Sequence, residues 1–314
     1  MEHYVTLFDS AFLPQGLALH ASMERCAGPY TLWVLCMDEA AQTVLSRLAL
    51  PNVRLLPLAA VETDELRRVK PTRTRGEYCW TLTPFTPQFV FDADASVQRV
   101  TYVDADTWLV RNPRAVFDEF EASGKAVLIT EHAYAPRYDQ SAASGRYCVQ
   151  FMTFVRDRGE TVRRWWAERC LEWCHARIED GKFGDQMYLN DWPQRFGADV
   201  HVLHNRAAMQ APWNTLVFAP GDALVFHFHG LRLMRGNQVL STDHYRINPP
   251  TFRSIYRPYM NDFAQALRTL RACGHVPRPQ IDRSPWAHRL RVLAQQALLR
   301  WRERPPARFH PLGG

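Results

Sequence analysis

The sequence has no continuous run of about 20 apolar residues, the length that a membrane-spanning helix requires. Residues 1–6 also lack the basic segment and the long apolar segment that together mark a secretory signal peptide. We therefore expect a cytoplasmic protein. Hydrophobic residues make up 46% of the 314 residues, so the chain can bury a sizeable core in one large domain or two smaller ones.

The seven cysteines are odd in number and scattered, unlike the even set of a secreted disulfide framework. Cys170 and Cys174 lie one helical turn apart, but no cluster of histidines or cysteines near them completes a tetrahedral zinc site. We expect buried thiols that pack as small hydrophobic side chains.

Basic residues are not in excess over most of the chain. Residues 1–282 contain 31 basic and 31 acidic residues, and residues 283–314 supply the whole formal net charge of +6. Nucleic-acid binding needs a basic face on the main body, so we expect no nucleic-acid partner.

The first third of the chain alternates apolar runs with amphipathic stretches, which predicts a mostly parallel sheet flanked by helices. The predicted strands are residues 4–8, 31–37 and 53–56, and the predicted helices between them are residues 13–26 and 39–48. Phe8-Asp9-Ser10 follows the first strand in place of a G-x-G-x-x-G turn, which argues against a nicotinamide-binding Rossmann domain.

The rest of the chain continues this α/β pattern. Pro84 and Pro87 interrupt a stretch that otherwise looks helical. The later predicted strands are residues 100–103, 126–130, 147–155, 200–203 and 224–228. The later predicted helices are residues 160–176 and 285–302, and an acidic, glycine-containing turn with a short helix is predicted over residues 179–189. We divide the chain into a catalytic domain, residues 1–240, and a helical, basic C-terminal appendage, residues 241–314.

Asp104 and Asp106 directly follow a predicted strand. In open α/β sheets, ligands gather at the carboxyl ends of the strands. Two carboxylates one residue apart can converge there on one hard divalent cation, Mg²⁺ or Mn²⁺, that keeps positions open for phosphate oxygens. The structural alternative is that one aspartate caps the following turn and the other is solvated.

His227 and His229 follow another apolar strand, and the alternation of a strand puts both on one face and Phe228 on the other. An imidazole beside carboxylates suits Mn²⁺ better than Mg²⁺. The alternative is a pair of hydrogen-bonded or surface histidines.

Gly184, Asp185 and Gln186 form a third feature. Gly184 allows close approach of the backbone, and Asp185 is placed to cap the short helix that follows. Asp185 and Gln186 can also form hydrogen bonds to sugar hydroxyls in a cleft.

Together these features resemble the metal-dependent GT-A glycosyltransferases, and among them the family 8 enzymes, as a divergent bacterial branch. The matching segments occur in the family's order over roughly residues 3–232. They are residues 6–9, 77–80, 102–106, 184–190 and 227–230. The resemblance implies a Rossmann-like nucleotide-diphospho-sugar transferase fold.

The resemblance also implies a function in bacterial cell-surface glycan biosynthesis. The enzyme would be a hexosyltransferase-like protein, dependent on Mn²⁺ or Mg²⁺, that moves a sugar from a nucleotide-sugar donor, a UDP-sugar being favoured, to a saccharide or glycolipid acceptor with retention. It implies Asp104, Asp106 and His227 as metal ligands and Asp185 and Gln186 at the reacting sugar. The remaining residues implied at the donor are Thr6, Phe8, Asp9, Ala105, Gly230 and Arg232.

Two departures from family 8 affect the donor site. The family's Gly-x-x-Lys-Pro-Trp segment is absent after Gly230, so Arg232 or Arg235 would take the place of the lysine. Gln150 ends the segment that normally carries an Asn-Ser/Gly pair. Retention leaves two routes open, internal return through an ion pair or a covalent intermediate on Asp185 or Gln186, and inversion would need a general base opposite the leaving group.

Two other classes of function remain as alternatives. A metal-dependent nucleotidyl- or phosphotransferase also needs paired aspartates, but the sequence has no Walker loop and no kinase H-R-D and D-F-G pair. A non-catalytic carbohydrate-binding protein is the other, and the intact Asp104, Asp106 and His227 argue against it.

The basic tail contains an amphipathic pattern. Its apolar stripe consists of Trp286, Leu290, Leu293, Ala297 and Trp301, and arginines flank it. Such a helix suits an anionic membrane surface, so we expect peripheral contact with the inner face of the membrane through residues 285–308. The alternative is that this stripe packs on the catalytic domain.

Overall fold

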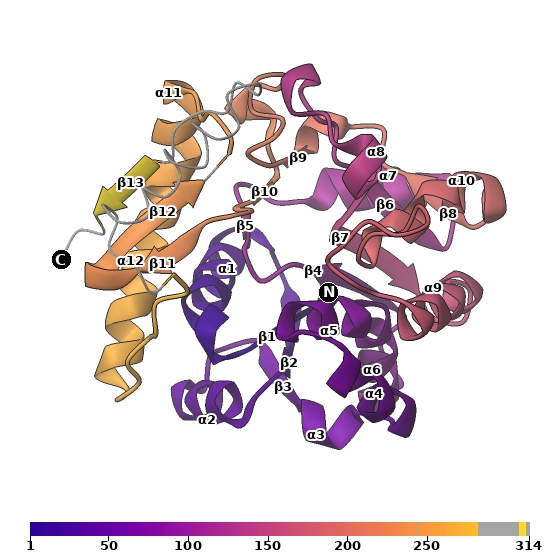
Figure 1. Ribbon diagram of the computed structural model, residues 1–314, viewed down its shortest axis with the longest axis horizontal. Helices are drawn as coiled ribbons and strands as arrows, with labels where there is room; N and C mark the ends of the chain where they lie inside the picture. The colour runs from indigo at the N-terminus through magenta and orange to yellow at the C-terminus, as the bar shows by residue number, and fades with distance from the viewer. Residues whose placement is uncertain (243, 282–307, 312–314) are drawn as a thin grey trace.

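The computed structural model describes residues 1–242, 244–281 and 308–311. Its centre is a seven-stranded sheet with the order β3-β2-β1-β4-β7-β6-β8 (Figure 1). Only β7 runs against the other strands, pairing antiparallel with β4 and β6. The strands are β1 Glu2–Phe8, β2 Tyr30–Cys36, β3 Val53–Pro57, β4 Arg99–Val103, β6 Val127–Glu131, β7 Tyr147–Val155 and β8 Val200–Val202. The predicted α/β class with a mostly parallel, helix-flanked sheet is confirmed.

Helices cover both faces of this sheet. Alternation along β1 sends Tyr4 and Phe8 into one core and Val5 and Leu7 into the other. The first core is closed by α1 Leu13–Cys26, α2 Glu39–Leu48, α7 Arg114–Ser123 and α12 Arg257–Ala272. The helices of the opposite face are α4 Asp64–Val69, α5 Arg75–Leu82, α6 Thr86–Ala93, α9 Glu160–Glu172 and α10 Trp192–Arg195. The short helices α3 Leu58–Val61, α8 Ser141–Ser144 and α11 Pro249–Thr251 lie between these elements.

Side chains cap the starts of α2 and α5. The Asp38 carboxylate accepts a hydrogen bond from the backbone N–H of Ala41 at the start of α2, at 2.8 Å. Thr74 and Glu77 form a reciprocal capping box at the start of α5. The predicted bounds of α1 and α2 are both confirmed. α2 begins at the Asp38 cap, whereas α1 has no side-chain cap and carries a proline in its first turn.

One predicted helix is too long and a second region is confirmed with a change of helix type. α9 ends at Glu172, four residues early, because Trp173 is extended. The turn and short helix predicted over residues 179–189 are present, and the helix is a 3-10 helix, η5 Gln186–Asp191. Gly181 and Gly184, with φ of +72° and +54°, adopt the left-handed conformation that prevents an earlier start.

Two smaller sheets extend from the central one. β5 Thr107–Leu109, β10 Val225–His227 and β9 Met209–Gln210 form the first, in the order β5-β10-β9. β11 Arg232–Met234, β12 Gln238–Thr242 and β13 Arg308–Pro311 form the second. In β10, His227 lies opposite Thr107, the residue after Asp106.

The C-terminal elements lie along one side of the molecule, beside α1 (Figure 1). Ala266 and Leu270 of α12 share a core with α1. The predicted boundary between residues 240 and 241 falls inside β12, and the division into two domains stays a prediction. The predicted helix 285–302 lies outside the described residues. Across residues 1–242, 244–281 and 308–311, no helix has both the length and the apolar character needed to cross a bilayer.

Gln280 joins this C-terminal side to the start of the chain. Its side-chain carbonyl accepts hydrogen bonds from the Gln15 amide and the Leu233 backbone N–H, both at 3.0 Å. Its amide donates to the carbonyl of Ala11, at 3.2 Å. One side chain thus connects the beginning of α1 with β11.

Candidate functional site

Asp104, Asp106 and His227 come together where β4 ends. Their ligand atoms all lie within 4.8 Å of one another. The His227 Nε2 atom is 3.1 Å from an Asp106 carboxylate oxygen and 3.7 Å from an Asp104 oxygen. The backbone holds this arrangement, because the N–H of Phe228 donates to the carbonyl of Asp106 at 2.8 Å. The structure therefore brings the two sequence motifs into one cluster.

Neighbouring side chains orient these three groups. The Gln150 side-chain oxygen lies 2.9 Å from His227 Nδ1, and the Tyr102 hydroxyl donates to Asp104 at 2.8 Å. An Nδ1–H that donates to Gln150 leaves Nε2 facing the carboxylates, as a metal ligand requires. Sequence reasoning assigned no role to Gln150 or Tyr102. Tyr102 could have been found, because it precedes Asp104 by two residues and so shares its side of the strand.

The charges of the cluster are strongly coupled. Burial alone would lower the pKa of His227, but the Asp106 and Asp104 carboxylates raise it well above its ordinary value. Burial opposes ionisation of Asp106, yet His227 and Arg232 together bring the pKa of Asp106 below its ordinary value. The pocket thus favours positive charge between the two carboxylates, and a divalent cation would satisfy the same field.

Asp185 lies at the N-terminus of η5, with only 2% of its surface exposed. Burial, with a further contribution from the Asp104 carboxylate, raises the pKa of Asp185 to about 7. Asp185 occupies the N-cap position of η5, as predicted, but its side chain makes no capping hydrogen bond to η5. The Gly184 turn directs this carboxyl group inward. The Trp166 indole N–H holds the backbone at this position by donating to the backbone carbonyl of Asp185, at 2.8 Å.

Gln186 is held at the edge of this region. Its side-chain amide donates to the backbone carbonyl of Ser144. The side-chain oxygen of Gln186 takes no part in this hydrogen bond.

The residues expected at the nucleotide base follow β1. Thr6 is fully buried, and Phe8 is packed so tightly on α1 that a Cβ at Gly16 would lie 2.5 Å from its ring. The Asp9 carboxylate forms an ion pair with Arg75, which also pairs with Asp38 at 2.6 Å. Asp9 thus lies just before α1, and Arg75 balances its negative charge.

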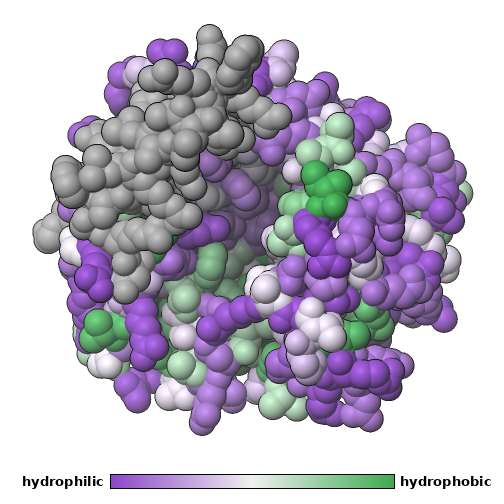
Figure 2. Space-filling view, in the orientation of Figure 1, coloured by the Kyte–Doolittle hydropathy of each residue, from purple (hydrophilic) through white to green (hydrophobic). Residues whose placement is uncertain are grey.

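Gly230 and Arg232 line a cavity of about 270 Å³. Its other lining residues are His229, Thr242, His244, Tyr245, Gln280 and Ile281. The Arg232 guanidinium stands over the Phe12 ring and lies 3.8 Å from the Asp106 carboxylate. Ala105, between the two aspartates, is buried. The molecule is hollowed near the centre of the face seen in Figure 2.

An aromatic wall borders the two histidines of the His-x-His motif. The Trp213 ring meets both His227 and His229 edge-on, with centroids 5.5 Å away in each case. His132 stacks on Tyr134 nearby, and burial lowers the pKa of His132 to about 3. His227 is buried while His229 is exposed, so their environments differ although they share one side of the strand.

Solved structures place this fold in a class. The WbbM bifunctional glycosyltransferase matches with a TM-score of 0.52 and 15% identity, covering 88% of this chain and 52% of that chain. This chain thus spans about half of WbbM. Mouse xyloside xylosyltransferase 1 matches with a TM-score of 0.49 and 14% identity, covering 73% and 97%. The chain has the GT-A glycosyltransferase fold.

Sequence relatives define its family. YfnF of Bacillus subtilis (strain 168) is 30% identical over 286 residues, which cover 85% of this chain and 94% of YfnF. YfnD of the same organism is 28% identical over 277 residues, covering 82% and 87%. No protein-family model matches the chain. The chain belongs to the same family as YfnF.

Proposed function

We propose that the chain is a metal-dependent glycosyltransferase that uses a nucleoside-diphosphate sugar, with a UDP-sugar favoured, and that it is related to family 8. The observation that carries this proposal is the meeting of Asp104, Asp106 and His227 at the carboxyl edge of a GT-A sheet, beside a cavity. The carboxyl edge of the sheet is where ligands bind in such folds, and the two aspartates with His227 are suited to bind a divalent cation there.

The three metal ligands, Asp104, Asp106 and His227, suit Mn²⁺ better than Mg²⁺. Two carboxylates offer hard oxygen ligands, and the imidazole oriented by Gln150 offers one nitrogen. When bound, such a cation stabilises the negative charge that develops on a departing diphosphate. Asp104, Asp106 and His227 would hold it, and Tyr102 would keep Asp104 turned toward it.

Arg232 and Gly230 support the diphosphate site. Arg232 lies close enough to Asp106 to add positive charge beside the cation. Gly230, with φ of +79° and nothing within 4 Å of an added Cβ, leaves its backbone open to a ligand. Arg232 would therefore replace the lysine of family 8, and the base would lie toward Thr6, Phe8 and Asp9.

Asp185 and Gln186 are the residues proposed at the reacting sugar. Asp185 is buried, and its Oδ2 atom has no hydrogen-bond partner among the described residues. A sugar hydroxyl would satisfy this oxygen by donating to it. Retention would proceed by internal return or through Asp185 or Gln186 as nucleophile. The anomeric configuration of the product, measured by NMR, separates retention from inversion.

A saccharide or lipid-linked acceptor is proposed, with the enzyme in the cytoplasm at the inner face of the membrane, in cell-surface glycan synthesis. The support is the basic, tryptophan-containing pattern of residues 285–308. Because β13 pairs with β12, truncation after residue 282 would remove a strand as well as the tail. Replacing arginines 289, 291, 300 and 302 by glutamine tests the membrane without that loss. Binding to anionic liposomes should fall, whereas unchanged binding would contradict the membrane proposal.

A donor screen tests the main proposal. The protein with Mn²⁺ is offered UDP-, GDP- and other nucleotide sugars, and release of nucleoside diphosphate and free sugar is measured, with Asp104→Asn as the control. Metal-dependent release of nucleoside diphosphate supports glycosyl transfer. Release of pyrophosphate or nucleoside monophosphate would instead favour a nucleotidyl- or phosphotransferase. Sugar binding without any turnover would favour a carbohydrate-binding protein.

A further inference from the structure

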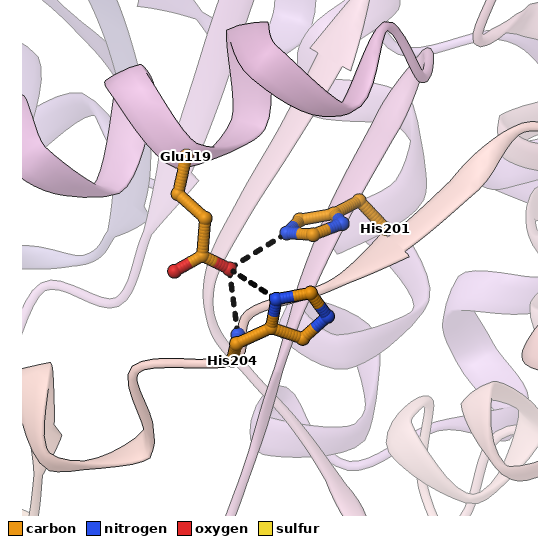
Figure 3. Close-up of side chains that lie close together, drawn as sticks. All are labelled: Glu119, His201 and His204. Atoms are coloured by element: carbon orange, nitrogen blue, oxygen red, sulfur yellow. Dashed lines mark hydrogen bonds and ion pairs between the residues drawn. The ribbon is translucent and has the colours of Figure 1, made fainter.

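A second group of metal-competent side chains lies outside the Asp104–Asp106–His227 cluster. Glu119 of α7, His201 of β8 and His204 just beyond β8 point toward one another (Figure 3). Their ligand atoms lie within 4.8 Å of one another. Glu119 Oε1 is 2.8 Å from His201 Nε2 and 3.6 Å from His204 Nδ1.

The fold, rather than a flexible surface, places these groups. β8 is the edge strand of the sheet, and α7 covers the face of the sheet on which His201 lies. Val200 points into the opposite core, so the alternation of β8 turns His201 toward α7. His201 is 6% exposed, and its ring lies beside the buried Phe120 ring of α7, with centroids 6.5 Å apart. His201 is therefore fixed by core packing, and Glu119 reaches it from the helix that covers this face.

The spacing suits a small tetrahedral ion. Zinc binds histidine nitrogen and carboxylate oxygen at about 2.0–2.2 Å, so two ligands of a tetrahedral site lie roughly 3.4 Å apart. The observed separations of 2.8 and 3.6 Å lie on either side of that value. The His204 side chain is 82% exposed, so solvent reaches the ligand position that the three residues leave open. Two imidazoles and one carboxylate favour zinc over Mg²⁺.

Glu119 also has a scaffolding role that a bound ion would preserve. The backbone N–H of His204 donates to Oε1 at 2.7 Å, and that of Asn205 donates to Oε2 at 3.3 Å. A carboxylate offers about four lone-pair positions, so these bonds leave room for a cation. Only the contact with His201 Nε2 must change, because that nitrogen has to give up its proton to bind a metal.

We propose that Glu119, His201 and His204 form a second cation site, which binds a divalent transition-metal ion of the zinc type. The ion would tie α7 to the segment after β8. That segment leads to β9, which pairs with β10, the strand that carries His227. The site would thus brace the scaffold beneath the candidate active site without contacting the donor.

Counting bound zinc tests this site. Chelator-treated protein is titrated with Zn²⁺ alone against a chromophoric competitor. We expect two equivalents in the wild type and one in His204→Ala. Asp104→Asn/Asp106→Asn should keep the Glu119 site. His275→Ala is the matched control, because His275 lies outside both clusters, and it should keep both equivalents.

A second variant separates metal binding from scaffolding. Glu119→Gln keeps one oxygen, which can accept the hydrogen bond from the His204 N–H, but it loses the longer hydrogen bond from Asn205 and weakens the metal ligand. We expect a small loss of melting temperature in chelator and a clearly reduced zinc-dependent rise, with zinc affinity at this site falling on the order of 100-fold. Cobalt(II) substituted at the site in the Asp104→Asn/Asp106→Asn protein should give the intense visible absorption of tetrahedral coordination. The same zinc count in wild type and His204→Ala, or no zinc-dependent rise in the wild type, would overturn the proposal.

Discussion

The two metal-competent clusters found among the described residues combine the same ligand types in opposite proportions. At the end of β4, two carboxylates face one imidazole, whereas between α7 and β8 two imidazoles face one carboxylate. The first cluster borders Arg232 and a cavity, and the second opens to solvent through His204. Oxygen-rich ligands beside a cationic side chain suit an ion that shares a diphosphate, and nitrogen-rich ligands suit an ion that stays in the scaffold. Ligand composition and surroundings together thus separate a chemical role from a structural one.

The largest effect is expected when one carboxylate is removed from the first cluster, which tests its chemical role directly. Asp104→Asn or Asp106→Asn should lower donor turnover on the order of 10²–10³-fold, because an amide is a weaker ligand and stabilisation of the leaving diphosphate is lost. EDTA should have the same effect and Mn²⁺ should reverse it, measured as nucleoside diphosphate release. Glu119→Gln is the control and should retain activity. Full activity in EDTA would remove the metal from the reaction.

Asp185→Asn asks whether a buried carboxyl group outside both clusters acts in the reaction. The rate should fall roughly 10²-fold if this group contacts the sugar, with KM for the donor changed less. Because Asp185 makes no capping hydrogen bond, the loss of melting temperature should be small. A variant that is equally stable and equally active per folded molecule would exclude Asp185 from the site.

The two histidines of the His-x-His motif offer a finer comparison. His227→Ala should weaken metal-dependent donor binding by about 10–100-fold, because it removes a ligand held by Gln150. His229→Ala should have a milder effect, because its ring contacts Trp213, Tyr245 and His227 but lies outside the metal cluster. Donor KM at a series of Mn²⁺ concentrations measures both. Equal, small effects would show that neither histidine binds the metal.

Glu77 provides a reference for a carboxylate that anchors backbone beside a histidine, the role Glu119 has without an ion. It accepts hydrogen bonds from the N–H groups of Ala176 and Thr74, both at 2.7 Å. Burial would raise the pKa of Glu77, but these bonds and His175 lower it to about 2. The unfolded chain takes up this proton first, so the stabilisation is complete above the ordinary pKa of 4.5 and is lost as pH falls toward 2.

Glu77→Gln should therefore cost about 1–3 kcal/mol at pH 7 and show a flatter loss of stability in acid than the wild type. Urea unfolding between pH 7 and pH 3 measures both. Parallel pH profiles for the two proteins would mean that Glu77 does not titrate as described.

The sequence predicted those parts of the molecule that are determined by residues close together in the chain. The bounds of α1 and α2 follow from apolar periodicity, helped by Pro14 at the start of α1 and the Asp38 cap of α2, and the pairing of Asp104 with Asp106 is a local motif. The meeting of these aspartates with His227 depended on the resemblance to a known family. The reversed direction of β7 in the middle of the sheet has no local signal, because strand direction is set by tertiary pairing.

The second cluster shows where such prediction ends. Glu119 and His201 are 82 residues apart and meet only because β8 pairs with β6 under α7. The spacing of His201 and His204 was the single local trace of this site. Likewise, Gln150 contacts His227 across 77 residues, and only the sheet order brings them together.

The hydrogen bonds of Gln280 have a consequence for how the protein is made. Chains begin to fold from the N-terminus while the ribosome is still adding residues. The segment around Ala11 and Gln15 emerges early, but the side chain that joins it to β11 arrives about 265 residues later. This flank of the cavity is therefore assembled late, as a contact of high sequence separation, and a nascent chain that stops short of residue 280 leaves these groups without their partner.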